Sequence, residues 1–73
     1  MLLIGDFARA RREYVRAQIW VEDEGWFNDG ERIPSRDLLI YVGVVNGDTL
    51  TYFLHCSSGK IIVCDIFDVT KVW

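Results

Sequence analysis

The chain has 73 residues, which is enough for one domain with one hydrophobic core but too short for a catalytic domain beside a regulatory one. Its net charge of −3 gives no overall basic field of the kind that drives sequence-independent binding to nucleic acid. The longest apolar run, 38–45, is far shorter than the roughly 20 residues that span a bilayer, and the N-terminus lacks the pattern of a secretory signal. These features predict a single soluble, cytoplasmic domain, 1–73, with Cys56 and Cys64 reduced.

The first quarter of the chain carries two competing patterns. Five apolar residues recur at helical spacing: Phe7, Ala10, Tyr14, Ala17 and Val21. From Tyr14 onward, however, β-branched and aromatic residues alternate with polar ones, which is typical of a strand. We therefore expect a short helical or irregular stretch over 7–13, followed by a strand over 14–21.

A polar connection follows at 22–36. It contains the breakers Gly30 and Pro34, and it places Trp26 and Phe27 among several carboxylates. Loops of this length in small domains are usually either disordered or functional. The sequence therefore predicts a long acidic loop that presents two aromatic side chains.

The C-terminal half gives the clearest signal. Two β-prone runs, 37–45 and 49–55, flank Asn46-Gly47, which is a preferred pair for a type I′ turn, and a third run follows at 60–67. Together they predict a three-stranded antiparallel meander over 37–67. The fold class expected is mainly β or α+β, with three to five antiparallel strands in all.

Two features of this meander stay open. A two-residue turn at Asn46-Gly47 would pair Tyr41 with Tyr52 and leave both faces of the hairpin largely apolar, whereas a sheet with one solvated face alternates apolar and polar residues. The second face therefore needs a cover: the N-terminal segment, the curl of a small barrel or a partner protein. The last residues, 68–73, are compatible with a short strand or with one helical turn.

Catalytic and metal-binding arrangements are not expected. His55 and Cys56 are adjacent on a predicted strand, so their side chains point to opposite faces, and Cys64 would share a face with His55 in only one of two registers. The acidic residues of 22–36 do not have the spacing of a calcium-binding loop. We expect no enzyme activity, no metal and no cofactor.

Binding residues are the stronger candidates. Trp26 and Phe27 among carboxylates suit a basic partner segment, although the same rings would complete the core if the loop folded back. The arginines would share one face of a helix, where they could dock on an acidic protein, contact nucleic acid or form a solvated face. The edges of the sheet could also pair with a partner strand. The candidate partner-binding residues are Trp26, Phe27, Glu22, Asp23, Glu24, Arg9, Arg12 and Arg16.

In size and composition, the chain resembles small bacteriophage-encoded proteins that seize host machinery, and most of all the transcription regulators of Xanthomonas phages. The resemblance extends over the whole chain but includes no diagnostic motif, so it assigns a role to no residue. It implies a non-enzymatic regulator that binds bacterial RNA polymerase in the host cytoplasm and occludes or displaces its specificity factor. An anti-CRISPR inhibitor and a nucleic-acid-binding small β-barrel are the alternatives.

Overall fold

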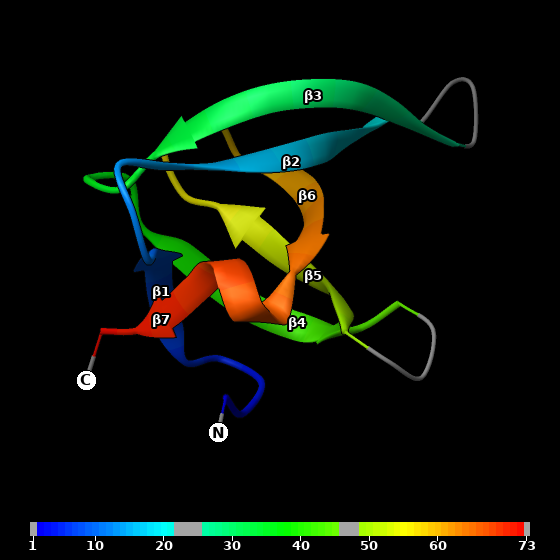
Figure 1. Ribbon diagram of the computed structural model, residues 1–73. Coiled ribbons are helices and arrows are strands. Elements are labelled where there is room, and N and C mark those ends of the chain that lie inside the picture. The colour runs from blue at the N-terminus through cyan, green and yellow to red at the C-terminus, as the bar shows by residue number, and fades with distance from the viewer. Residues whose placement is uncertain (1, 22–25, 46–48, 73) are drawn as a thin grey trace.

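The computed structural model describes residues 2–21, 26–45 and 49–72, which form one antiparallel sheet curled into a half-barrel (Figure 1). Its strands are β1 (Phe7–Ala10), β2 (Tyr14–Val21), β3 (Trp26–Pro34), β4 (Leu39–Val44), β5 (Leu50–His55), β6 (Lys60–Asp65) and β7 (Val69–Lys71), with a 3-10 turn, η1 (Ile66–Asp68), before β7. Their order in the sheet is β3-β2-β6-β5-β4-β1-β7. The mainly β fold class is confirmed, but the sheet has seven strands rather than three to five.

The helical or irregular stretch expected over 7–13 is wrong for its first residues, because Phe7–Ala10 is the strand β1. β1 pairs with β4 on one side and with β7 on the other, so its backbone groups are satisfied between two strands. Ala8 and Ala10 point inward and are buried, while Arg9 between them is exposed. Long-range pairing therefore overrides the helical spacing of the apolar residues. The strand predicted over 14–21 is confirmed as β2.

The long loop expected over 22–36 is also wrong over most of its length. Residues 26–34 form β3, which pairs with β2 as an antiparallel hairpin. Gly30 has a φ of +69°, and it lies where the register shifts between Ala17↔Glu31 and Ile19↔Asn28. This glycine thus allows a β-bulge inside the strand instead of ending the strand. Glu22, Asp23 and Glu24 lie outside the described residues.

The predicted meander is confirmed as β4, β5 and β6, but the predicted register of its first hairpin is wrong. Tyr41 lies opposite Phe53 rather than Tyr52, the register shifts again between Tyr41 and Gly43, and the N–H of Val45 donates to the carbonyl of Leu50. Because side chains alternate along a strand, a shift of one residue exchanges the two faces. Tyr41 and Phe53 therefore both point inward, with ring centroids 5.6 Å apart.

Of the two alternatives for 68–73, the structure has the short strand, and a helical turn lies just before it. β6 ends at Asp65, and its carboxylate Oδ1 accepts the N–H of Phe67 at 2.9 Å, which caps the 3-10 turn η1. The chain then continues as the short edge strand β7, which pairs with β1. The turn takes the last residues of the run that was predicted as a strand over 60–67.

The sheet curls so that its inner apolar face is covered by the sheet itself, which is one of the three possibilities considered from the sequence. Inward-facing side chains from across the sheet meet in one core, which contains Ala8, Ala10, Val15, Ala17, Ile19, Ile33, Leu39, Tyr41, Phe53, Ile62, Cys64 and Val69. The convex side of the hairpin β4–β5 faces away from this core and stays apolar. Within the described residues, no helix has the length and apolar character needed to cross a membrane.

Candidate partner-binding surfaces

The structure separates the residues that the sequence grouped as a binding site. Trp26 and Phe27 begin β3, where their backbones pair with Val21 and Trp20, so they belong to a strand instead of a loop tip. The predictions about their side chains, and about Glu22, Asp23 and Glu24, fall outside the described part of the structure and stay predictions.

The predicted arginines are all exposed, but they do not share a helical face. Arg9 lies on β1, Arg12 in the connection to β2, and Arg16 on β2. Only Arg12 and Arg16 come together, since both line a hollow of about 420 Å³ that also contains Tyr14 and Asp68.

This hollow belongs to a larger cleft between β2 and η1. β2 pairs with β6 only at Gln18↔Val63 and Ile19↔Ile62, and beyond these pairs the two strands separate. A second hollow of about 550 Å³ lies at the separation and shares Arg16 and Asp68 with the first. We call these two adjoining hollows the β2–η1 cleft.

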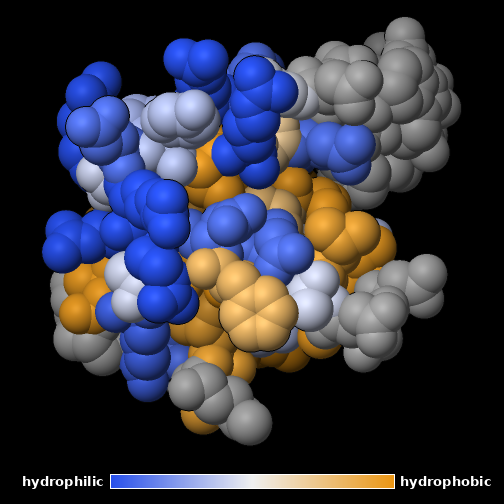
Figure 2. Space-filling model, viewed as in Figure 1, coloured by the Kyte–Doolittle hydropathy of each residue, from blue (hydrophilic) through white to orange (hydrophobic). Residues whose placement is uncertain are grey.

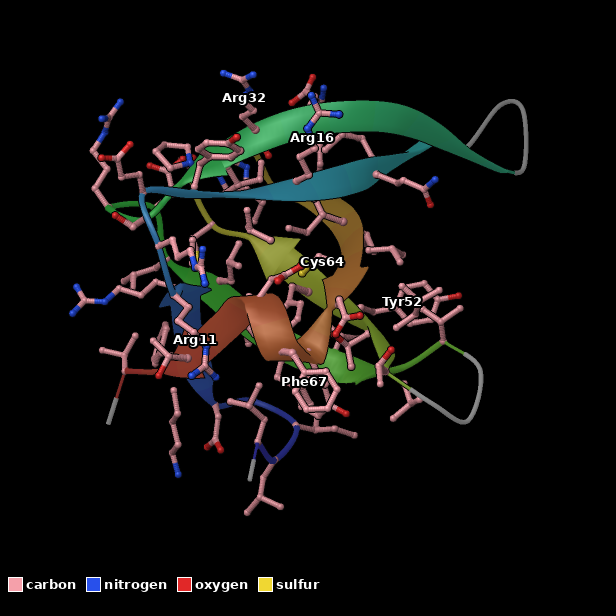
Figure 3. The ribbon with its side chains drawn as sticks, viewed as in Figure 1. Arg11, Arg16, Arg32, Tyr52, Cys64 and Phe67 are labelled. Atoms are coloured by element: carbon pink, nitrogen blue, oxygen red, sulfur yellow. The ribbon has the colours of Figure 1, made fainter. Side chains whose placement is uncertain are left out.

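Arg11 holds η1 in place beside the cleft. Its Nε donates to the carbonyl of Phe67 at 3.0 Å, one Nη donates to the carbonyl of Val69 at 3.2 Å, and its backbone N–H donates to the carbonyl of Asp68 at 2.9 Å. Figure 3 shows the Arg11 side chain directed toward the η1–β7 segment. The turn presents Phe67, whose side chain is 68% exposed. Sequence reasoning assigned no role to Arg11 or Phe67, because it placed Phe67 in a strand and did not predict β1.

The β2–β3 hairpin carries a second unforeseen arginine, Arg32. It is the direct cross-strand neighbour of Arg16, and its guanidinium carbon lies 4.9 Å from the centre of the Tyr14 ring. Figure 3 shows Arg16 and Arg32 extending away from the ribbon of this hairpin. In the space-filling view, hydrophilic side chains gather over the same region, at the top of the molecule (Figure 2).

The convex side of β4–β5 has a different character. Along β5, and along β4 as far as its bulge at Val42, odd-numbered residues face the core and even-numbered residues face outward. We call the outward set the outer face, and it contains Leu38, Ile40, Val42, Leu50, Tyr52 and Leu54. Val42 is 41% exposed and Leu50 47%, although both are aliphatic residues of a strand. Tyr52, labelled in Figure 3, extends outward from the same hairpin.

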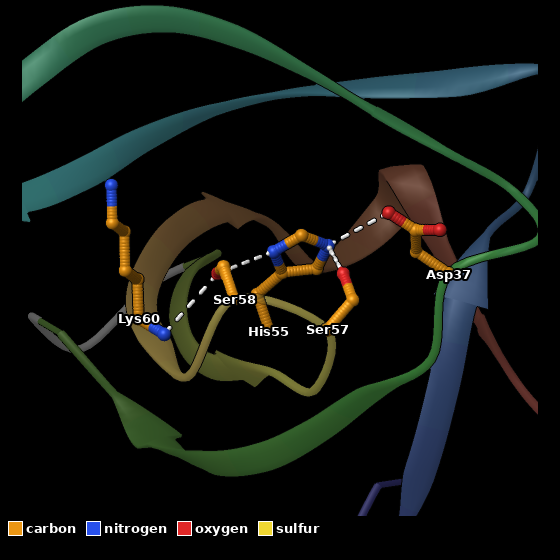
Figure 4. Close-up of polar contacts among 5 residues, drawn as sticks. All are labelled: Asp37, His55, Ser57, Ser58 and Lys60. Carbon is orange, nitrogen blue, oxygen red and sulfur yellow. Dashed lines mark hydrogen bonds and ion pairs between the residues drawn. The ribbon is translucent and has the colours of Figure 1, made fainter.

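A polar cluster joins Asp37 to the turn between β5 and β6 (Figure 4). His55 Nε2 lies 2.8 Å from the Asp37 carboxylate and 3.0 Å from Ser57 Oγ, while His55 Nδ1 lies 2.7 Å from Ser58 Oγ. Because a carboxylate only accepts, Nε2 carries the proton and Nδ1 accepts the hydroxyl proton of Ser58. The Oγ of Ser58 in turn accepts the N–H of Lys60 at 3.2 Å.

Asp37, His55 and Ser58 are linked in the order of a catalytic Asp–His–Ser triad. The other features of the cluster are structural, and we call it the His55 clasp. The backbone N–H groups of Ser58 and Gly59 both donate to the carbonyl of His55, so neither is available to an oxyanion. None of these residues lines the β2–η1 cleft. The cluster therefore ties the start of β4 to the end of β5.

Neither cysteine forms a catalytic pair within the described residues. Cys56 is exposed, whereas Cys64 is buried in the core. His55 and Cys64 share the inward face, but they lie on rungs His55↔Lys60 and Thr51↔Cys64, which are four residues apart, or roughly 13 Å along the strand. The described part of the chain also contains no group of three His, Cys, Asp or Glu side chains that could hold a metal ion.

Comparisons of the chain with protein-family models, with curated proteins and with solved structures give no match. Its function must therefore be argued from its own surfaces.

Proposed function

We propose that this protein is a non-enzymatic regulator that binds a protein partner through the outer face of β4–β5. The observation that supports the proposal is the apolar character of that face in a sheet whose opposite face already contains the core. Contiguous exposed apolar side chains on a small domain are typical of interaction sites.

The position of the face supports a stable docking surface. Ile40 and Leu54 are cross-strand partners, so their side chains lie side by side on this face. Each strand of the hairpin has a paired neighbour on its other side, β1 for β4 and β6 for β5. The outer face is thus held on a rigid part of the sheet, which lowers the entropy cost of binding.

The partner that we propose is bacterial RNA polymerase, with occlusion or displacement of its specificity factor as the mode of action. The support for this partner is the resemblance in size and composition to phage transcription regulators, whereas the support for the binding face is structural. The two parts of the proposal can therefore fail separately.

Purified bacterial RNA polymerase holoenzyme tests the partner. We expect the protein to co-elute with the polymerase in size-exclusion chromatography and to reduce promoter-dependent transcription. The Leu50→Asp variant should lose both effects, because it places an unpaired charge in the apolar interface, while Arg36→Asp, an exposed change away from the face, should keep both. No co-elution at micromolar concentrations would reject the polymerase as partner.

A further inference from the structure

Two arginines stand directly opposite each other on the β2–β3 hairpin. Arg16 and Arg32 are cross-strand partners, and like charges in this position are destabilising. Both side chains are exposed, and within the described residues neither makes an ion pair or a hydrogen bond. Among the described residues, this pair of positive charges therefore has no ion-pair partner.

Other groups extend this pair into a site. Arg32 lies against the exposed ring of Tyr14, 4.9 Å from its centre, which holds the guanidinium in place by a cation–π contact. Arg12 lines the same hollow as Tyr14 and Arg16. Tyr14 thus contacts Arg32 and lines one hollow together with Arg12 and Arg16.

We propose that Arg16 and Arg32, assisted by Arg12, bind a carboxylate side chain in an acidic segment of the protein partner. Guanidinium groups bind carboxylates through pairs of parallel N–H donors, and Tyr14 offers an apolar surface for the adjoining methylene groups. The inference rests on the proposed function, since it assigns the carboxylate to a protein.

The surrounding charges favour a single carboxylate over a chain of phosphates. Glu13 and Asp68 line the same hollow as Arg12 and Arg16. A nucleic-acid strand would bring several phosphates toward these two carboxylates, whereas one side chain contacts only the guanidinium groups. The net charge of −3 adds a repulsion that grows with the charge of the ligand.

A rhodamine-labelled, C-terminally amidated Gly-Ser peptide with one glutamate (the one-glutamate peptide), titrated at low ionic strength and followed by anisotropy, tests the proposal. Arg16→Gln and Arg32→Gln should each raise the Kd by about tenfold, since each removes a charge-assisted contact. Arg9→Gln, an equally exposed arginine on β1, should leave the Kd unchanged. Equal affinity for all four proteins, or no binding by the wild type, would overturn the proposal.

Titrations with an oligothymidylate and with inorganic phosphate distinguish the source of the anion. Tighter binding of the oligonucleotide than of the one-glutamate peptide, lost in Arg16→Gln and Arg32→Gln, would mean that the site serves nucleic acid and would contradict the protein carboxylate. Phosphate should bind more weakly than the peptide and should compete with it.

The Arg32→Glu variant separates binding from folding. It replaces the repulsion across the pair with an attraction, so the thermal midpoint should rise while binding of the one-glutamate peptide is lost. A fall in both would show that Arg32 acts in folding and would overturn the proposal. Val42→Asp changes the outer face at a residue that does not line the cleft. It should bind the one-glutamate peptide normally and lose the polymerase, so that failure of the outer face and failure of the arginine site give different results.

Discussion

At the scale of single residues, the two cysteines occupy opposite environments. Burial raises the pKa of the Cys64 thiol to about 12, with further contributions from the negative charges of Asp68 and Asp65, whereas Cys56 is exposed. Iodoacetamide at pH 8 should therefore add one group to the folded protein, at Cys56, and two groups in denaturant. Peptide mapping by mass spectrometry checks this result, and rapid modification of Cys64 in the folded protein would contradict it.

The same thiol couples stability to alkaline pH. Its pKa in the folded protein, about 12, lies above the value of 9.0 for a free thiol, so the unfolded chain loses this proton first as the pH rises. The free energy of unfolding should therefore fall as the pH rises from 9 toward 12, and replacement of Cys64 by Ala should reduce this dependence. Urea unfolding at several pH values measures the effect, and an equal slope in both proteins would exclude Cys64 as its source.

The clasp at His55 gives a second residue-scale prediction. Asp37→Ala removes the carboxylate that accepts the Nε2 proton of a buried imidazole, which should lower the free energy of unfolding by about 1–3 kcal/mol. Arg36→Ala changes the preceding exposed residue and should have little effect. If the two variants unfold at the same denaturant concentration, the clasp makes no net contribution to stability.

At the scale of elements, η1 depends on a single distant side chain. Arg11→Ala removes two hydrogen bonds to the carbonyls of Phe67 and Val69, and should cost about 1 kcal/mol of stability. Hydrogen exchange should accelerate at Phe67 and Val72 more than at the central strand β5. Arg12→Ala is the matched control, and faster exchange in both variants to the same extent would show that Arg11 has no special role.

The sequence was sufficient for the elements that local patterns define. β2, β4, β5 and β6 follow from β-prone runs and turn residues, and their hairpin order follows from short connections. β1 and β3 could not be identified in this way. β1 is a strand because it pairs with β4 on one side and with β7 on the other. β3 is mostly polar, and Ile33 is the buried aliphatic residue among its described side chains.

The candidate site shows the same limit. Arg12 and Arg16 were recognised as a basic group from their spacing. Arg32 lies beside Arg16 only because β3 pairs with β2. This pairing was not predicted, because Gly30 and Pro34 were interpreted as residues of a loop. The outer face could be foreseen as apolar, yet its members changed with the register. A bulge between Tyr41 and Gly43 determines that register, and the turn residues of the hairpin do not predict this bulge.

At the scale of the whole molecule, the half-barrel divides its apolar residues between a closed inner core and an open outer face. Substitution of the core residue Phe53, which has no exposed surface, by Ala should cost about 3–5 kcal/mol and unfold so small a domain. Val42→Asp and Leu50→Asp should leave the thermal midpoint within a few degrees of the wild type, because both side chains are nearly half exposed. Circular dichroism melts compare the three variants. Unfolding of the outer-face variants would show that these side chains belong to the core.

The most direct test of the central claim is the capture of partners from nuclease-treated bacterial lysate on the tagged wild type and on the folded Leu50→Asp and Arg36→Asp variants. The account predicts that one set of proteins, identified by mass spectrometry, is retained by the wild type and by Arg36→Asp but is absent with Leu50→Asp. Retention of the same proteins by all three would contradict binding through the outer face.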